Sequence, residues 1–182
     1  MRVCLSRFSY DIGNHEEGSS ENWQSYFARY PSPYLGSGST TEGYWGKEVG
    51  PVHVIGLNTY YGSSSTSHQY LWLQKYLATK VDRKKTPWLI VLQHAPTYST
   101  NIGHWKEAEL FRRSIEPLLY KYKVDVMLSG HIHSYERTFP VYNYTRVDDG
   151  ITYFNLGDAG NYEGTYINTL IYTYANILYM LT

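Results

Sequence analysis

Short apolar runs rich in β-branched residues recur along the chain, with polar and helical stretches between them. Runs of this length, bounded by Gly, Pro, Asn and Ser, are typical of buried strands. The Pro-, Gly- and Ser-rich segment 31–43 is predicted to be a loop on the same grounds. The predicted strands cover residues 52–58, 88–92, 124–128 and 151–156.

Helical patterns lie between these strands. Apolar residues recur at helical spacing over 70–77, and Ser67 stands where it would cap the start of that helix. A second apolar stripe runs over 108–122, where Pro117 is expected to kink or divide the helix. The alternating order predicts an α/β layered fold, in a single domain spanning 1–182.

The charges of the chain balance, because sixteen Lys and Arg stand against sixteen Asp and Glu. A chain without net charge has no overall field to draw it onto nucleic acid or an anionic membrane, so neither is predicted as a partner. Cys4 is the single cysteine, which excludes an internal disulfide framework and argues against a cysteine-based zinc site.

The two ends of the sequence carry no clear targeting or membrane pattern. Residues 1–11 include arginines but no apolar run long enough for a signal-peptide core, so no signal peptide is expected in this chain. The uncharged stretch 165–182 just reaches the length of a membrane span. Its Asn, Thr and Tyr residues favour a buried strand or an unpaired terminal segment instead.

Histidines follow two of the predicted strands. His94 comes after 88–92, while His131 and His133 come after 124–128, behind Gly130, which is expected to let the backbone turn. The carboxyl ends of strands in an open α/β sheet form the edge where ligands bind, and imidazole is the commonest side-chain metal ligand. The sequence therefore predicts metal binding here, in preference to rings that only satisfy buried hydrogen bonds.

Two further polar motifs stand outside that histidine group. In GNHEE, Asn14 offers an amide oxygen to a cation and His15 stands beside it as a donor, although Gly-Asn is also ordinary turn chemistry. His104 precedes a predicted helix, and either reaches an anion from that terminus or is an exposed loop histidine. Taken alone, these motifs leave both interpretations open.

The motifs together resemble the purple acid phosphatases of the calcineurin-like metallophosphoesterase superfamily. GNHE, VLQHAPTYST and GHIHSYERT occur in the family's order, and LGDAGNYEG resembles its late Gly-Asp-Gly-Gly-Asn segment. The similarity covers residues 13–164. It implies an α/β fold of the four-layered αββα type, incomplete at the N-terminal side of this chain.

The resemblance also implies an activity, which is hydrolysis of phosphate monoesters by a hydroxide at a dinuclear centre of Fe(III) with Zn(II), Fe(II) or Mn(II). It implies a secreted, extracellular or vacuolar-lysosomal location, in which the glycosylation pattern at Asn143 would matter. The residues carried over are Asn14, His94 and His131 for the divalent metal, His133 for the ferric ion, and His15 and His104 for hydrogen bonding the phosphate or protonating the leaving alcohol.

The sequence departs from the family pattern before residue 13. The GDxG and GDxxY motifs, which would supply two aspartates and a tyrosinate, are not found, and Tyr10 and Asp11 are too close to GNHE to replace them. Three of four divalent-site ligands remain, against one of four ferric-site ligands. We therefore expect an N-terminally truncated catalytic domain with an incomplete ferric site and impaired activity, although one zinc ion on Asn14, His94 and His131 is conceivable.

Two other interpretations remain open at this point. The chain is alternatively a non-catalytic fragment or a metal-binding module that keeps the scaffold. Within the same superfamily, a phosphodiesterase or pyrophosphatase would share the metal core. No sequence pattern predicts an oligomeric state.

Overall fold

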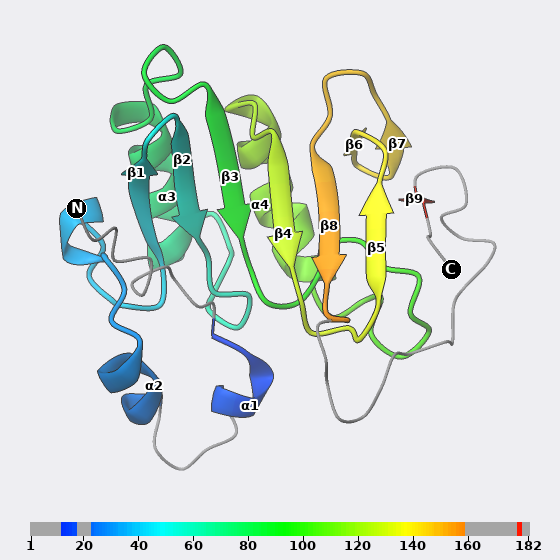
Figure 1. Ribbon diagram of the computed structural model, residues 1–182, viewed down its shortest axis with the longest axis horizontal. Coiled ribbons are helices and arrows are strands. Elements are labelled where there is room, and N and C mark those ends of the chain that lie inside the picture. Colours follow the sequence, from blue (N-terminus) through cyan, green and yellow to red (C-terminus); the bar gives the residue numbers. More distant parts are fainter. Residues whose placement is uncertain (1–11, 18–22, 159–177, 180–182) are drawn as a thin grey trace.

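The structure is a computed structural model that describes residues 12–17, 23–158 and 178–179. Within these residues, a seven-stranded mixed sheet has the order β1-β2-β3-β4-β8-β5-β9 (Figure 1). A separate two-stranded sheet pairs β6 with β7. The strands are β1 (Trp45–Val49), β2 (Val52–Gly56), β3 (Trp88–Leu92), β4 (Val126–Ser129), β5 (Tyr135–Thr138), β6 (Val141–Tyr142), β7 (Thr145–Arg146), β8 (Thr152–Leu156) and β9 (Leu178–Tyr179). The helices are α1 (Asn14–Glu17), α2 (Gln24–Arg29), η2 (Leu35–Ser37), α3 (His68–Thr79) and α4 (Glu109–Lys121).

The four strands at the centre of the sheet, β2, β3, β4 and β8, run parallel. Their bounds match the four predicted apolar runs closely, so these predictions are confirmed. Strands β1 and β5 pair antiparallel with β2 and β8, and β9 pairs antiparallel with β5. Because the central strands are parallel, their carboxyl ends all meet at one edge of the sheet.

Helices α3 and α4 pack on the same face of the sheet, behind it in Figure 1. Leu73 of α3 and Ile115 of α4 are fully buried in one cluster with the strand residues Ile55, Leu89 and Met127. Burying this many apolar side chains supplies the main stabilisation of the layer. The predicted cap of α3 is confirmed, since the Ser67 hydroxyl accepts a hydrogen bond from the Tyr70 backbone amide at 3.3 Å.

Helix α4 continues through Pro117, so of the two predicted effects of this proline, a kink or a division, the structure excludes division. Pro117 lies on the exposed side of the helix, and so does Arg113, the residue whose carbonyl would have accepted the missing amide bond. The buried stripe that includes Ile115 and Leu118 holds both halves of the helix against the sheet.

The opposite face of the sheet carries half-buried apolar side chains. Val54, Ile90 and Val126 stand side by side in the register of β2, β3 and β4, and point away from α3 and α4. The described residues therefore supply one helix layer and one large sheet of the expected αββα arrangement. The predicted fold class, an incomplete α/β sandwich, is confirmed.

Several sequence predictions lie wholly or partly outside the described residues. Among them are Tyr10, Asp11 and most of the stretch 165–182. Leu178 and Tyr179 form β9 against β5. No helix in the described part of the chain is long and apolar enough to cross a membrane.

Candidate metal centre

The predicted site residues lie beyond the carboxyl ends of the central strands. His94 follows β3, His131 and His133 follow β4, and Asn14 begins α1, which lies below this edge in Figure 1. The loops after β3 and β4 continue the pairing of their strands. The backbone amide of Gln93 donates to the Leu128 carbonyl, and that of Gly130 donates to the His94 carbonyl, each at 3.0 Å.

The loop after β4 is a tight double turn. The amide of Ile132 donates to the Gly130 carbonyl and the amide of Ser134 donates to the Ile132 carbonyl, both at 2.7 Å. His131 takes the left-handed conformation, with φ of 67°. Gly130 opens the turn with its carbonyl, as its place after the strand predicted, but the left-handed and strained residue is the histidine that follows it.

The three side chains predicted for the divalent metal converge on one another. The Asn14 Oδ1 atom lies 3.0 Å from His94 Nε2 and 3.2 Å from His131 Nδ1. The two imidazole rings are 5.0 Å apart, centroid to centroid. Residues separated by 117 positions thus present three donor atoms to a common point.

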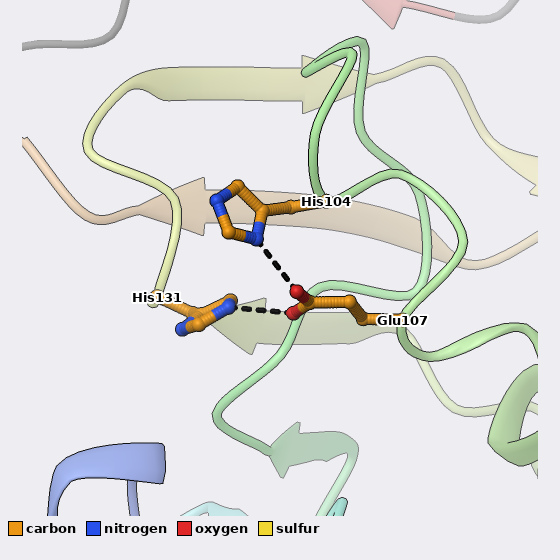
Figure 2. Close-up of side chains that lie close together, drawn as sticks. All are labelled: His104, Glu107 and His131. Carbon is orange, nitrogen blue, oxygen red and sulfur yellow. Dashed lines mark hydrogen bonds and ion pairs between the residues drawn. The ribbon is translucent and has the colours of Figure 1, made fainter.

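His104 joins this group through Glu107, which sequence reasoning missed. Figure 2 shows the Glu107 carboxylate between two imidazoles, accepting from His104 Nδ1 and from His131 Nε2, each at 2.6 Å. The ligand atoms of these three residues all lie within 4.8 Å of one another. The available signal was the spacing of His104 and Glu107, which places both on one side of a helical turn.

Burial keeps the two central imidazoles neutral. The pKa of His94 is lowered to about 4, chiefly by desolvation and also by the neighbouring imidazoles of His131 and His15, against the opposing charge of Glu107. Desolvation also lowers the pKa of His131, while Glu107 raises it. A neutral ring keeps a nitrogen lone pair available for a cation, and the lowered pKa of His94 preserves this at mildly acidic pH.

His15 and His133 lie near the cluster, at its margins. His15 is exposed in α1, next to Asn14, and its charge acts on His94. His133 is half-buried and its charge acts on His131. The structure therefore brings Asn14, His94 and His131 together directly and His104 through Glu107, while it leaves His15 and His133 beside them.

The donor set fits a divalent cation. Imidazole nitrogens suit zinc and similar first-row ions, an amide oxygen suits harder divalent ions such as manganese, and a water would complete four-coordination. Of the ligands predicted for a ferric ion, the sequence supplies His133 alone. One neutral imidazole does not offset a triple positive charge, so His133 by itself does not fit ferric iron.

Comparison with known proteins identifies the family of the chain. The model of the calcineurin-like phosphoesterase family matches residues 9–135, which hold the whole Asn14, His94 and His131 cluster. The chain belongs to the calcineurin-like phosphoesterase family.

Curated relatives within the calcineurin-like phosphoesterases carry phosphatase names. Purple acid phosphatase 21 of Arabidopsis thaliana is 45% identical over 157 residues, covering 84% of this chain and 36% of the relative. Phosphoenolpyruvate phosphatase of Allium cepa is 38% identical over 179 residues, covering 89% and 37%. The chain thus spans about a third of the length of the relatives it matches.

A solved structure supports the fold. Purple acid phosphatase from yellow lupin (Lupinus luteus) seeds superposes with a TM-score of 0.69 over 90% of this chain and 32% of its own, at 24% identity. At that identity the likeness is evidence for the architecture alone, and it agrees with the mixed α/β sheet described above.

Proposed function

We propose that this chain carries the divalent half of the metal site of an acid phosphatase that hydrolyses phosphate monoesters. The observation that supports the proposal is the convergence of Asn14 Oδ1, His94 Nε2 and His131 Nδ1, with 3.0 Å and 3.2 Å between the amide oxygen and the two nitrogens. Family membership and the phosphatase names of the relatives supply the reaction class.

Asn14, His94 and His131 would hold the cation. A divalent ion at this position lowers the pKa of water and neutralises charge on a phosphoryl group. His15 and His104 flank the cluster and act as hydrogen-bond donors to the phosphate oxygens. The Nδ1–H group of His104 is engaged with Glu107. When the ring is protonated, the proton on its other nitrogen, Nε2, is therefore the one that it transfers to the leaving alcohol.

We expect one divalent cation and weak turnover from this chain by itself. His133 remains assigned to the second metal position, but it brings no negative charge to that position. A phosphoryl group that meets one cation instead of two loses part of the electrostatic stabilisation of its transition state. Impaired activity is therefore the expected state of the isolated chain.

Metal titration of the purified chain tests this assignment. Zn²⁺ and Co²⁺ are expected to bind with a stoichiometry of one, measured by calorimetry and by the Co²⁺ absorption spectrum. His94→Ala should abolish measurable binding, while His68→Ala, an exposed histidine outside the cluster, should leave it unchanged. A folded chain that binds no divalent ion, or binds it equally well without His94, overturns the proposal.

Substrate profiling then separates the remaining alternatives. An acid phosphatase should release phosphate from a chromogenic monoester at mildly acidic pH in preference to diesters or pyrophosphate. Metal binding without any turnover would identify a metal-binding module. The secreted or vacuolar location stays a prediction, and it accords with Asn143, which is exposed at the turn between β6 and β7.

A further inference from the structure

Glu107 sits between two histidines and holds one nitrogen of each. Its two oxygens are engaged separately, Oε1 with His104 Nδ1 and Oε2 with His131 Nε2 (Figure 2). The segment that presents it is built from successive turns. The amide of Glu107 donates to the His104 carbonyl at 3.0 Å, and the Asn101 side chain accepts from the His104 amide at 3.1 Å.

The other nitrogen of His131 faces the proposed metal cluster. Its Nδ1 atom lies 3.2 Å from Asn14 Oδ1, on the side of the ring opposite to Glu107. A neutral imidazole carries one proton, so a ring that donates from Nε2 presents a lone pair at Nδ1. Two lone pairs at this distance, on Nδ1 and on the amide oxygen, are favourable when a cation lies between them.

Distances discriminate this arrangement from a metal held by His104, Glu107 and His131 themselves. Two ligand atoms about 2.0–2.1 Å from a tetrahedral zinc lie about 3.3 Å apart. The 2.6 Å contacts of Glu107 are shorter than that and match hydrogen bonds from N–H groups to a carboxylate. The 3.0 Å and 3.2 Å contacts of Asn14 are close to the spacing of two ligands of one ion.

We infer that Glu107 is a positioning residue that selects the Nε2–H tautomer of His131, so that Nδ1 is free to bind the divalent cation. The inference rests on the proposed metal site and adds a residue to it. The desolvation of Glu107 costs little free energy, because its side chain is still 42% exposed. The His131 ring is only 9% exposed, so it loses little further water when it donates to Glu107. Carboxylates that accept from the second nitrogen of a metal-bound histidine orient the ring and raise its basicity.

Nuclear magnetic resonance of the metal-free protein tests the tautomer directly. In ¹⁵N-labelled wild-type protein, the His131 ring, assigned with His131→Asn, should show a protonated Nε2 and an unprotonated Nδ1. Glu107→Gln should move the proton toward Nδ1, because the new amide can donate to Nε2. Glu107→Ala should leave a mixture of the two tautomers.

Metal affinity provides the second readout. Glu107→Gln and Glu107→Ala should weaken Zn²⁺ binding about 10–100-fold, and Glu107→Asp should restore part of the loss. Glu48→Gln is the matched control, since Glu48 is likewise a partly exposed carboxylate, but it pairs with Lys85 outside the cluster and should change neither readout. Because Glu107 is half exposed, these variants are expected to fold, which thermal unfolding checks.

The outcomes separate this inference from the proposed function. An unchanged His131 tautomer in Glu107→Gln overturns the inference, whether or not metal affinity falls. A wild-type protein that binds no cation overturns the proposed function, while the tautomer experiment still decides the role of Glu107.

Discussion

Asn155, at the end of β8, clamps the loop that carries His131: its side-chain amide donates to the Ile132 carbonyl at 2.8 Å. The same amide donates to the Ser134 carbonyl at 2.7 Å. Asn155 is 2% exposed, so no water replaces these bonds if they are lost. The double turn with its left-handed histidine is therefore held from the neighbouring strand.

Replacing Asn155 by Asp should loosen this turn. A carboxylate cannot donate to the two carbonyl oxygens and would repel them, and one unsatisfied buried polar group costs about 1–3 kcal/mol. We expect a lower free energy of unfolding, measured in urea, and weaker Zn²⁺ binding. Asn155→Leu, which also cannot donate but adds no charge, should be less destabilising than Asn155→Asp. Equal metal affinity in all three proteins would contradict the clamp.

Gly157 packs against the backbone of the same loop. A Cβ atom at this position would lie 1.9 Å from the Ile132 carbonyl oxygen, which is backbone and cannot move aside alone. Gly157→Ala should therefore destabilise the protein by at least about 1–3 kcal/mol, the usual cost of overpacking, and should weaken metal binding. Gly36→Ala is the control, because nothing lies within 4 Å of its added Cβ. Similar thermal unfolding of both variants would show that the loop tolerates displacement.

The buried carboxylate of Glu116 should be required for stability. It is 2% exposed, accepts from Arg112 at 2.7 Å and from the Tyr153 hydroxyl at 3.1 Å, and also binds the Tyr98 hydroxyl. Glu116→Ala removes the acceptor of the two buried tyrosine hydroxyls and one of the two carboxylate partners of Arg112, and should cost about 3–5 kcal/mol in urea unfolding.

The control for this network is Arg113→Ala in the same helix. Arg113 is exposed and pairs with Glu109 at 2.7 Å, and exposed pairs contribute about 0–1 kcal/mol. If both variants lose the same stability, the buried network around Glu116 contributes no more than a surface ion pair.

The lowered pKa of Glu109 predicts how the free energy of unfolding changes in acid. Hydrogen bonds from Arg112 hold the pKa of its carboxyl at about 2, below the ordinary value of 4.5, although burial opposes the shift. A carboxyl whose pKa is lowered by folding stabilises the protein above its unfolded pKa, and this stabilisation is lost as pH falls from 4.5 to about 2.

Glu109→Gln should therefore lower the free energy of unfolding at neutral pH by about 1.5–3 kcal/mol, the usual contribution of hydrogen bonds to a charged group. The difference from wild type should shrink as pH is lowered below 4.5. Urea unfolding at a series of pH values measures it, with the exposed Asp148→Asn as control. A difference that stays constant with pH would contradict the assigned pKa.

The central strands were predictable because each is a short apolar run, which a strand buried in a parallel sheet requires. Strands β1 and β5 were not predictable, since their sequences, WGKEV and YERT, contain glycine and charged residues and form no apolar run. Their strand conformation depends on pairing with β2 and β8, which no local pattern records. The continuation of α4 past Pro117 was missed for the same reason, because packing against the sheet overrides local propensity.

Position after a strand identified His94 and His131 as candidates from the sequence, because parallel strands end at one edge. Asn14 could be assigned to the metal site only through the family resemblance, since Gly-Asn also marks ordinary turns. Neither position after a strand nor the family resemblance identified Glu107. A charged residue just before the apolar stripe of α4 has the sequence pattern of solvent-exposed surface.

The sequence by itself determined the order of the four central strands and the two long helices, the edge of the sheet at which the histidines emerge and the family to which they point, because local pattern and chain direction are sufficient for these. Only the tertiary structure decided that Asn14, His94 and His131 meet at one point and that Glu107 faces the second nitrogen of His131. Those facts depend on distances between segments far apart in the chain, which are set by packing and hydrogen bonding across the folded sheet.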